Sequence, residues 1–367
     1  MNDQNSRYAR HYSLKGFGLQ AQLKLGQASV LVIGAGGLGC PALQYLVAAG
    51  VGKIGIVDGD RVALSNLQRQ VLFDTSDIGE PKATTAARKL RKLNPDITID
   101  AFDVPITTAN AFHLLAGYAV VLDCTDNFAS RYLINDACVL LKKTVIFGAV
   151  SRFEGQVAVF NKTEKSANYR DLFPVPPDAS EVPDCNEAGV LGVLPGIIGT
   201  FQATEAIKLI CQLDGLLENR LLTFNLLTYE SFIIDIQASE NIRHAIPATQ
   251  TAFEAINYDW LCGSALRGID ELNVTEFLEQ TANENAAIID VREPAEMPKL
   301  HFKNKNIPLS GWPENLPEIK EDHLVVFCQS GKRSLKAAKM LQEIFGPNKK
   351  ISHLRGGVIA LNEHTNG

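Results

Sequence analysis

The sequence predicts an α/β protein of two domains, the first of which contains a largely parallel sheet. The apolar run at residues 28–33 leads directly into a glycine-rich turn, and a helical pattern and a second apolar run follow it. Continuous apolar runs are typical of parallel strands that are buried on both faces. A similar order of strand, loop and helix returns around residue 328. A chain of 367 residues is long enough for two hydrophobic cores.

The composition narrows the class of protein. A net charge of −6 gives no reason to expect a nucleic-acid partner. No segment reaches the roughly 18 uncharged apolar residues of a membrane span, and the polar residues 1–10 do not resemble a signal peptide. Seven scattered cysteines, an odd number, are typical of reduced thiols. We therefore expect a cytoplasmic protein without membrane or nucleic-acid partners.

The order of elements divides the chain. The first domain is expected at residues 1–238, a linker without clear periodicity at 239–265 and the second domain at 266–367. The polar, proline-rich stretch 163–186 predicts a long surface loop. In the first domain we expect helices at 38–49, 82–93 and 196–213, strands at 28–33, 53–57, 97–102, 119–123, 144–149 and 155–160, and a hairpin at 221–236. In the second domain we expect strands at 287–291 and 324–327 and a helix at 334–344.

The glycine-rich turn predicts a nucleotide site. Gly34, Gly36 and Gly39 fit G-x-G-x-x-G between a strand and a helix. Glycines let the backbone approach a phosphate, and the helix N-terminus offers free N–H groups. Asp58 follows at the distance expected for an acid that binds ribose. This pattern alone suggests NAD about as readily as ATP, so a nicotinamide-dependent oxidoreductase is one alternative.

The residues that follow favour ATP. Arg69 and Lys82 can stabilise the charge that builds on a leaving pyrophosphate. Asp126 and Asn127 come after the strand at 119–123, at the sheet edge where open parallel sheets bind ligands. A carboxylate there can hold Mg²⁺ that bridges phosphates. The sequence offers no acid–base histidine near this edge, which argues against the oxidoreductase.

Eight short motifs, in this order, resemble the MoeB/ThiF family, bacterial relatives of ubiquitin-activating enzymes, over residues 5–235. They are RYARH at 7–11, GAGGLGCP at 34–41, VDGD at 57–60, SNLQRQ at 65–70, GEPK at 79–82, DCTDN at 123–127, GQV at 155–157 and EAGVLG at 187–192. The resemblance implies a Rossmann-like ATP-binding domain that adenylates the C-terminal Gly-Gly carboxylate of a ubiquitin-like sulfur-carrier protein, with ATP and Mg²⁺ as reactants.

The same resemblance implies roles for single residues. Asp126 is expected to ligate Mg²⁺, and Arg10 resembles an arginine finger that reaches the ATP of the other subunit in a homodimer. Asp58 is expected at the ribose. The remaining nucleotide-binding residues implied are Gly34, Gly36, Gly37, Gly39, Ser65, Asn66, Arg69, Gln70, Lys82 and Asn127.

The family's zinc site does not carry over. Relatives often have two Cys-x-x-Cys pairs that bind structural zinc, but here the first pair falls on Asn168 and Asp171. The second falls on Asp259 and Cys262, so that one thiol remains. Because closed zinc sites need four good ligands, we expect no zinc.

The cysteines fall into two groups. Cys185 lies in a polar loop and matches a cysteine that some relatives link covalently to the carrier; an exposed thiol without a role is the alternative. Four other cysteines of the first domain lie in apolar strand or helix patterns. We expect them to pack in the core, since free Cys packs as a small hydrophobe. These are Cys40, Cys124, Cys138 and Cys211.

The second domain carries a candidate sulfur nucleophile. Cys328 to Ser334 fits C-x-x-G-x-R-S, where loop N–H groups, a helix N-terminus and Arg333 favour the thiolate. This loop and IDVRE at 289–293 resemble the rhodanese family over residues 266–363. The resemblance implies that Cys328 takes sulfur from a persulfide or thiosulfate donor. The usual Gly-His-Ile is replaced by Lys299, Leu300 and His301, so a rhodanese-like module that regulates without transferring sulfur is a second alternative.

Together these features predict one enzyme with two steps. The first domain adenylates a sulfur carrier, and a persulfide on Cys328 converts the acyl-adenylate to a thiocarboxylate. We favour the small subunit of molybdopterin synthase, and hence molybdenum cofactor biosynthesis. The carriers of the thiamine pathway and of tRNA thiolation are the alternatives.

Overall fold

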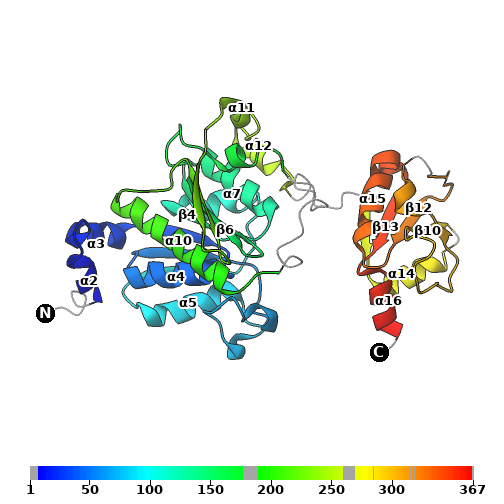
Figure 1. Cartoon of the computed structure of the whole chain (residues 1–367), viewed down its shortest axis with the longest axis horizontal. Helices are drawn as coiled ribbons and strands as arrows, with labels where there is room; N and C mark the ends of the chain where they lie inside the picture. The colour runs from blue at the N-terminus through cyan, green and yellow to red at the C-terminus, as the bar shows by residue number, and fades with distance from the viewer. Residues whose placement is uncertain are drawn as a thin grey trace. The chain divides into compact units, whose positions relative to one another are not determined.

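Two compact units make up the chain. The computed structural model describes residues 7–176, 189–258, 269–283, 285–313, 316–317 and 319–365. Internal contacts divide the chain between Cys262 and Gly263 (Figure 1). Each unit has its own sheet and its own hydrophobic core. The predicted α/β class is therefore confirmed in both units.

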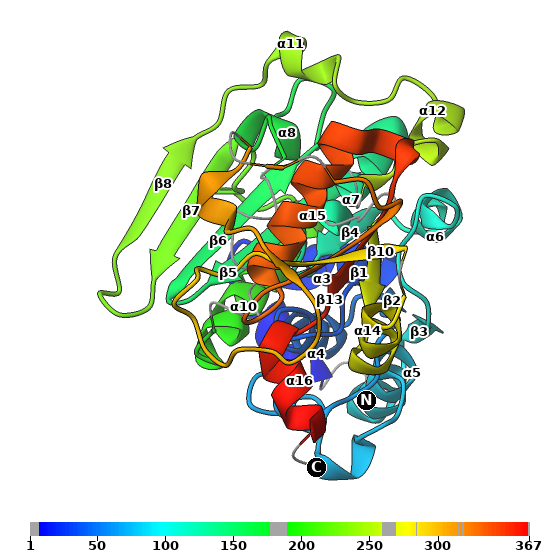
Figure 2. The same cartoon turned by 90° about the vertical axis from the view of Figure 1, so that its right-hand side faces the viewer.

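An eight-stranded sheet forms the centre of the first unit, in the order β3-β2-β1-β4-β5-β6-β7-β8. The strands β3 to β5 of that order run parallel, and β6, β7 and β8 continue antiparallel, side by side in Figure 2. The strands are β1 (Ser29–Ile33), β2 (Lys53–Val57), β3 (Thr98–Phe102), β4 (Val120–Asp123), β5 (Thr144–Ser151), β6 (Glu154–Phe160), β7 (Arg220–Asn225) and β8 (Ser231–Asp235).

Helices cover both faces of this sheet. In β1, Val30 and Val32 enter one core while Leu31 and Ile33 enter the other, as period-two alternation requires. The first core includes α3 (Gly18–Gln27), α4 (Gly39–Ala49), α5 (Lys82–Leu93) and α10 (Val193–Cys211). The second includes α6 (Ala111–Ala116), α7 (Phe128–Leu140), α8 (Tyr169–Leu172) and α12 (Gln250–Glu254). Two short helices, α2 (Ala9–Tyr12) and α11 (Glu240–Arg243), complete the unit with the 3₁₀ turns η1 (Leu64–Asn66) and η2 (Thr75–Asp77).

The strand order creates a crevice between β1 and β4. These strands are neighbours, but α4 after β1 and α7 after β4 lie on opposite faces. Open α/β sheets bind ligands outside the carboxyl ends of strands at such a point. Gly34 leaves β1 with φ +96°, and a Cβ there would lie 2.7 Å from the Cys124 carbonyl oxygen at the end of β4. Only glycine permits this close approach.

The stretch that we expected to be surface loop is partly buried. Its described part, up to residue 176, contains α8, and residues 166–170 are buried. Asn168 caps α8 by accepting the Arg170 N–H at 2.9 Å. Polarity misled the prediction because Arg170 is paired with Asp136 inside the unit. Residues 177–188 lie outside the described part of the chain.

The segment expected to begin the linker also packs on the first unit. Phe253 of α12 is fully buried in the second core, with ring centroids 5.2 Å from Phe112 and 5.6 Å from Tyr258. The Ser239 N–H donates to Asp171 at 2.8 Å. Residues 239–258 are therefore part of the first unit. The hydrophobic periodicity of this segment is weak because its helices α11 and α12 are short and α12 buries only Phe253.

The second unit has a five-stranded parallel sheet in the order β11-β10-β12-β13-β9. Its strands are β9 (Ile269–Leu272), β10 (Ala286–Asp290), β11 (Lys305–Asn306), β12 (His323–Phe327) and β13 (Lys350–Leu354). Its helices are α14 (Val274–Thr281), α15 (Lys332–Phe345) and α16 (Gly357–Thr365), with 3₁₀ turns η3 (Leu309–Gly311) and η4 (Gly346–Asn348). None of the helices in the described ranges of either unit is long and apolar enough to cross a membrane.

Replacing Phe253 with alanine should destabilise the first unit, because it leaves a cavity between Phe112 and Tyr258. A buried Phe→Ala change costs about 3–5 kcal/mol. Thr251→Ala is the matched control, since Thr251 is exposed on the same helix. Calorimetric unfolding of the full chain measures both; equal midpoints for the two variants would show that α12 does not contribute to the core.

Candidate functional site

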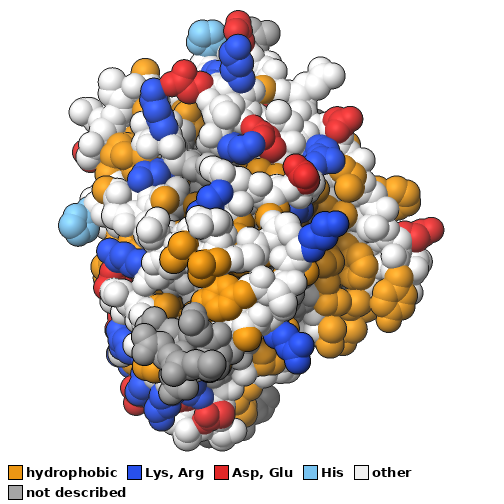
Figure 3. Space-filling view, turned by 90° about the vertical axis from the view of Figure 1, so that its left-hand side faces the viewer, with side chains coloured by type: hydrophobic (Ala, Val, Ile, Leu, Met, Phe, Trp, Pro, Cys, Tyr) orange, Lys and Arg blue, Asp and Glu red, His pale blue; other side chains and the backbone are white. Residues whose placement is uncertain are grey.

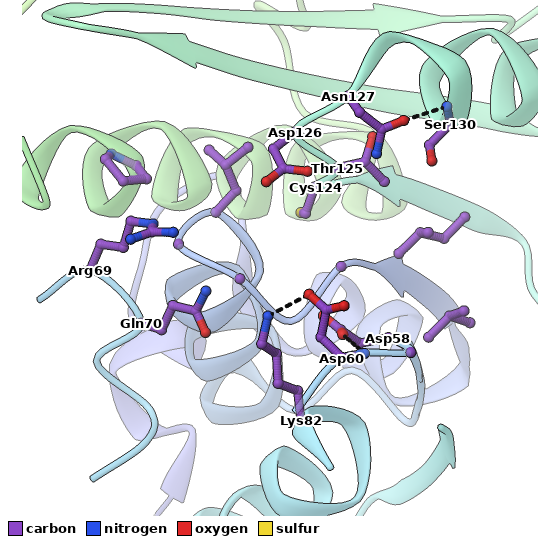
Figure 4. A pocket seen from close by; sticks show the side chains of 18 of the residues that line it. Asp58, Asp60, Arg69, Gln70, Lys82, Cys124, Thr125, Asp126, Asn127 and Ser130 are labelled. Carbon is purple, nitrogen blue, oxygen red and sulfur yellow. Dashed lines mark hydrogen bonds and ion pairs between the residues drawn. The ribbon is translucent and has the colours of Figure 1, made fainter. Parts of the chain in front are cut away.

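A cavity of about 420 Å³ opens at the carboxyl ends of β1, β2 and β4. Segments distant in sequence line it, among them Gly34 and residues 36–38 of the glycine turn, residues 57–60, 68–70, 104–106, 124–127 and 189–190, and Lys82. Figure 4 shows Arg69, Gln70 and Lys82 on one side of the cavity and Asp126 on the other. The cavity thus joins residues that the sequence suggested separately.

Asp58 joins the ends of β1 and β2. Its carboxylate accepts the Ala35 N–H at 2.7 Å through one oxygen and the Asp60 N–H at 2.8 Å through the other. Burial raises the pKa of Asp58, and the Lys82 charge opposes this increase. The carboxylate is thereby fixed in orientation, with lone pairs left to accept from the hydroxyls of a ribose.

Two cations and a buried amide line the cavity on the side that faces Asp126 (Figure 4). Lys82 begins α5, is 5% exposed and pairs with Asp60 at 2.8 Å. Arg69 donates to the Ser65 carbonyl at 3.1 Å. Gln70 is 3% exposed, and its Oε1 has no hydrogen-bond partner among the described residues. A buried acceptor without a partner on a cavity wall is a natural contact for a ligand or for water.

Ser65 and Asn66 lie in η1, before the segment 68–70 that reaches the cavity. Neither lines it. Asn66 Oδ1 accepts the Ala63 N–H at 3.2 Å and so holds the turn that carries Arg69. Nucleotide binding by Ser65 and Asn66 stays a prediction, because without bound nucleotide the structure shows only their contacts within the loop.

The DCTDN segment presents one free carboxylate. Asp123 is 2% exposed, its pKa is raised by burial, and it accepts the Thr125 hydroxyl at 2.7 Å. Asn127 caps α7 by accepting the Ser130 N–H at 2.8 Å. Asp126 lines the cavity and is exposed, without a hydrogen bond or ion pair to the rest of the described chain. A free carboxylate on the wall of this cavity fits Mg²⁺, which takes one or two protein carboxylates along with substrate phosphates.

Besides Ser65 and Asn66, Gly39 and Arg10 are expected site residues that are not among the described residues lining this cavity. Arg10 lies exposed in α2 and does not line the cavity of its own chain. Cys185 lies outside the described residues. The four cysteines expected in the core, Cys40, Cys124, Cys138 and Cys211, are all buried, and burial raises the pKa of the Cys40 thiol to about 12.

Cys328 follows β12 in a tight loop at the start of α15. The loop turns at Gly331 with φ +88°, and the Cys328 carbonyl accepts the Val358 N–H at 2.9 Å. The thiol is fully buried, with Sγ 3.5 Å from the Ser334 hydroxyl. A cysteine at the N-terminus of a helix is placed as expected for a nucleophile.

Two ion pairs support this loop, and one of them sequence reasoning missed. Glu296 binds both terminal nitrogens of Arg333, at 2.5 and 2.6 Å, and this bond lowers the pKa of Glu296 to about 2. Arg292 is 2% exposed, pairs with Asp290 and donates to Gln329 at 3.3 Å. The only sequence signal for Glu296 was its acidic charge soon after the IDVRE motif.

Comparisons with known proteins agree with both halves of this description. Residues 8–243 match the ThiF family and residues 273–364 the rhodanese-like domain. The adenylyltransferase and sulfurtransferase MOCS3 of Drosophila persimilis is 38% identical over 98% of this chain and 83% of its own length. The probable adenylyltransferase/sulfurtransferase MoeZ of Mycobacterium tuberculosis is 38% identical over 97% of this chain and 92% of its own.

Two further relatives match the first unit. The sulfur carrier protein adenylyltransferase of Thermus thermophilus is 46% identical over 70% of this chain and 96% of its own length. The crystal structure of E. coli MccB with ATP is similar with a TM-score of 0.56, at 22% identity over 64% of this chain and 73% of that one. This last likeness concerns the fold alone.

The fold and the two sites define an enzyme that joins an adenylyltransferase unit to a sulfurtransferase unit. The chain belongs to the ThiF family and carries a C-terminal rhodanese-like domain. ATP use follows from this membership.

The ion pair of Glu296 should make the second unit sensitive to acid. Because the pKa of Glu296 is lowered from 4.5 to about 2, its stabilisation is complete above the higher value and is lost as pH falls toward the lower one. Glu296→Gln should remove this part of the acid dependence. Calorimetry of the full chain between pH 5 and about 2.5 measures it, with the exposed Glu279→Gln as control. Equal slopes for Glu296→Gln and wild type would contradict the assignment.

Proposed function

We propose that this enzyme adenylates the C-terminal Gly-Gly carboxylate of a ubiquitin-like sulfur-carrier protein and then converts it to a thiocarboxylate. The observation that carries the first step is the free carboxylate of Asp126 facing Arg69 and Lys82 across one cavity (Figure 4). The cysteine loop of the second unit carries the second step. The name of the Thermus relative, a sulfur carrier protein adenylyltransferase, supports this substrate class.

Residues on the cavity wall can orient ATP for the reaction. The turn at 34–39 lies at the start of α4, where N–H groups favour phosphate. Asp58 would accept from the ribose. The carrier's carboxylate oxygen attacks the α-phosphorus, the bond to the bridging oxygen breaks, and pyrophosphate leaves. Arg69 and Lys82 stabilise the negative charge on the leaving pyrophosphate. Because this charge is larger in the transition state than in bound ATP, the two cations lower the barrier.

Mg²⁺ held by Asp126 would neutralise phosphate charge and help to align the triphosphate. Asn127 fixes the start of α7 and hence the backbone that carries Asp126. Asp60 is 75% exposed and pairs with Lys82, so it holds the ammonium group at the cavity before nucleotide binds.

Arg10 would complete the site from a second copy of the chain. It is exposed in α2 and is absent from the cavity of its own subunit. Leu14, Leu19 and Leu23 nearby are 57%, 53% and 49% exposed. Figure 3 looks onto the side of the first unit that carries α2 and α3, where hydrophobic side chains lie between Lys and Arg. Exposed apolar side chains beside a cation are suited to a homodimer contact.

Sulfur transfer would use a persulfide on Cys328. Its terminal sulfur attacks the acyl carbon, AMP leaves, and an acyl disulfide joins the carrier to Cys328. A second thiolate then attacks the Cys328 sulfur, which releases the thiocarboxylate and leaves a disulfide that an external thiol reduces. Cys185 is our candidate for this second thiol. The sulfur donor is a persulfide or thiosulfate.

Among carriers we favour the small subunit of molybdopterin synthase, and therefore molybdenum cofactor biosynthesis in the cytoplasm. The resemblance of the first unit to MoeB supports this choice. The thiamine-pathway and tRNA-thiolation carriers end in the same Gly-Gly chemistry, so the experiment below includes all three.

Asp126→Asn should lower carrier-dependent pyrophosphate release by on the order of a hundredfold or more, because an amide is a weaker ligand for the Mg²⁺ that would neutralise the developing phosphate charge. Release is measured from ATP with each of the three Gly-Gly carriers in turn. Glu80→Gln is the control, since Glu80 is exposed and does not line the cavity. Release with one carrier alone names the pathway, and no release with any of them would contradict the proposed substrate.

Cys328→Ser should abolish sulfur transfer from thiosulfate to cyanide, because the serine cannot form a persulfide. Pyrophosphate release should stay unchanged. Lys336→Ala, an exposed change on the same helix α15, is the control. If Cys328→Ser matched wild type in thiocyanate production, the second unit would be a regulatory module and not a transferase.

A further inference from the structure

We propose that a metal-free clamp of Asp136, Arg170 and Tyr258 fastens residues 239–258 to the first unit. It lies where the family resemblance would place two cysteine pairs around zinc. The clamp joins three elements: α7, α8 and the chain just after α12. This inference does not depend on the proposed carrier or on sulfur transfer.

The residues at the first pair's positions do not fit zinc. Asn168 Oδ1 accepts the Arg170 N–H at 2.9 Å, and Asp171 accepts the Asn168 N–H at 2.8 Å. The other Asp171 oxygen accepts the Ser239 N–H at 2.8 Å. These oxygens are engaged in capping and in fastening the backbone, and closed zinc sites favour thiolate and imidazole ligands. Asp259 and Cys262 lie outside the described residues.

The clamp is built as a buried, fully bonded ion pair. Arg170 donates to both oxygens of Asp136, from Nε at 2.8 Å and from Nη2 at 2.7 Å. The two side chains are 4% and 0% exposed. Tyr258, itself buried, donates its hydroxyl to Asp136 at 2.7 Å. Asn135 adds a donor at 3.1 Å. A carboxylate held this way can stay charged without water.

The environment also fixes the protonation states. Burial and the neighbouring Asp136 charge raise the pKa of Tyr258, so its hydroxyl remains a donor. Burial alone would lower the pKa of Arg170, but its bonds to Asp136 raise it overall. The guanidinium carbon lies 4.8 Å from the Tyr132 ring, which supports the charge from its other side. The contact therefore persists across the neutral pH range.

The segment is held at several points. Ser239 is bonded at the start, and Phe253 and Tyr258 are buried near the end. Between them, residues 243–248 border a cavity of about 650 Å³ whose walls include Val139 and Asn161. In the middle, Arg243 donates to the Ser166 carbonyl at 3.3 Å, and Ile246 and Pro247 are buried. The Tyr258 hydroxyl bond holds the end of the segment that lies beyond these contacts.

Hydrogen exchange of the full-length protein tests the clamp. Tyr258→Phe keeps the ring and removes only the hydroxyl, so the fold is retained. Amides of residues 249–258 should exchange about tenfold faster than in wild type, and the exposed Tyr229→Phe should change nothing there. Wild-type protein should contain no stoichiometric zinc, and a chelator should leave its exchange unaltered.

Two outcomes would overturn the proposal. Exchange of residues 249–258 that is equal in Tyr258→Phe and wild type would show that the hydroxyl does not fasten the segment. One zinc per chain whose removal accelerates the same amides would show a metal cross-link. Arg170→Lys provides a second probe, because it keeps the charge but loses the paired hydrogen bonds; it should accelerate exchange as well.

Discussion

The close approach of two backbones at the carboxyl ends of β1 and β4 is the constraint on which the first site depends. Gly34 lies against the Cys124 carbonyl, and a Cβ at Gly39 would lie 1.9 Å from the Gly34 carbonyl oxygen. These contacts bring the start of α4 beside the segment that carries Asp126. The phosphate-binding turn and the acidic residue therefore meet across a single cavity. Arg69 and Gln70, from the loop after η1, and Lys82, at the start of α5, line the same cavity at this edge of the sheet.

Much of the fold and part of the site could be predicted because they follow from local rules. Apolar runs marked the buried strands, and Gly34, Asp58 and Asp126 follow strand ends, whose side chains must share an edge in a parallel sheet. Ser65 and Asn66 carry the same polar signal but do not line the cavity. The sequence does not reveal which way the side chains of a short 3₁₀ turn face. Arg170 and Glu296 were missed for a related reason. A charge buried in an ion pair has the same sequence pattern as a solvated one until its partner, distant in sequence, is known.

The two units use one local solution for different chemistry. In each, a parallel strand ends in a turn with a glycine at positive φ, Gly34 in the first and Gly331 in the second, and a helix begins shortly afterwards. Backbone N–H groups at such a helix start favour negative charge. In the first unit this charge would be phosphate, and in the second a thiolate or persulfide. The surroundings of the two turns differ. In the first unit, Arg69 and Lys82 line an open cavity. In the second unit, Cys328 is buried against Ser334, and Arg333 of the same loop pairs with Glu296.

Each unit contains a buried ion pair between an arginine and an aspartate. Asp290 and Asp136 are each bonded by an arginine through two donors, in places where water is excluded. Removing either arginine would leave an uncompensated buried carboxylate, which is far more costly than the loss of an exposed pair. A metal cross-link would hold the same elements through thiolates whose oxidation can release it. An arginine–carboxylate pair cannot be oxidised in this way, so the proposed Asp136–Arg170 contact would still join α7 and α8 when thiols of the chain react.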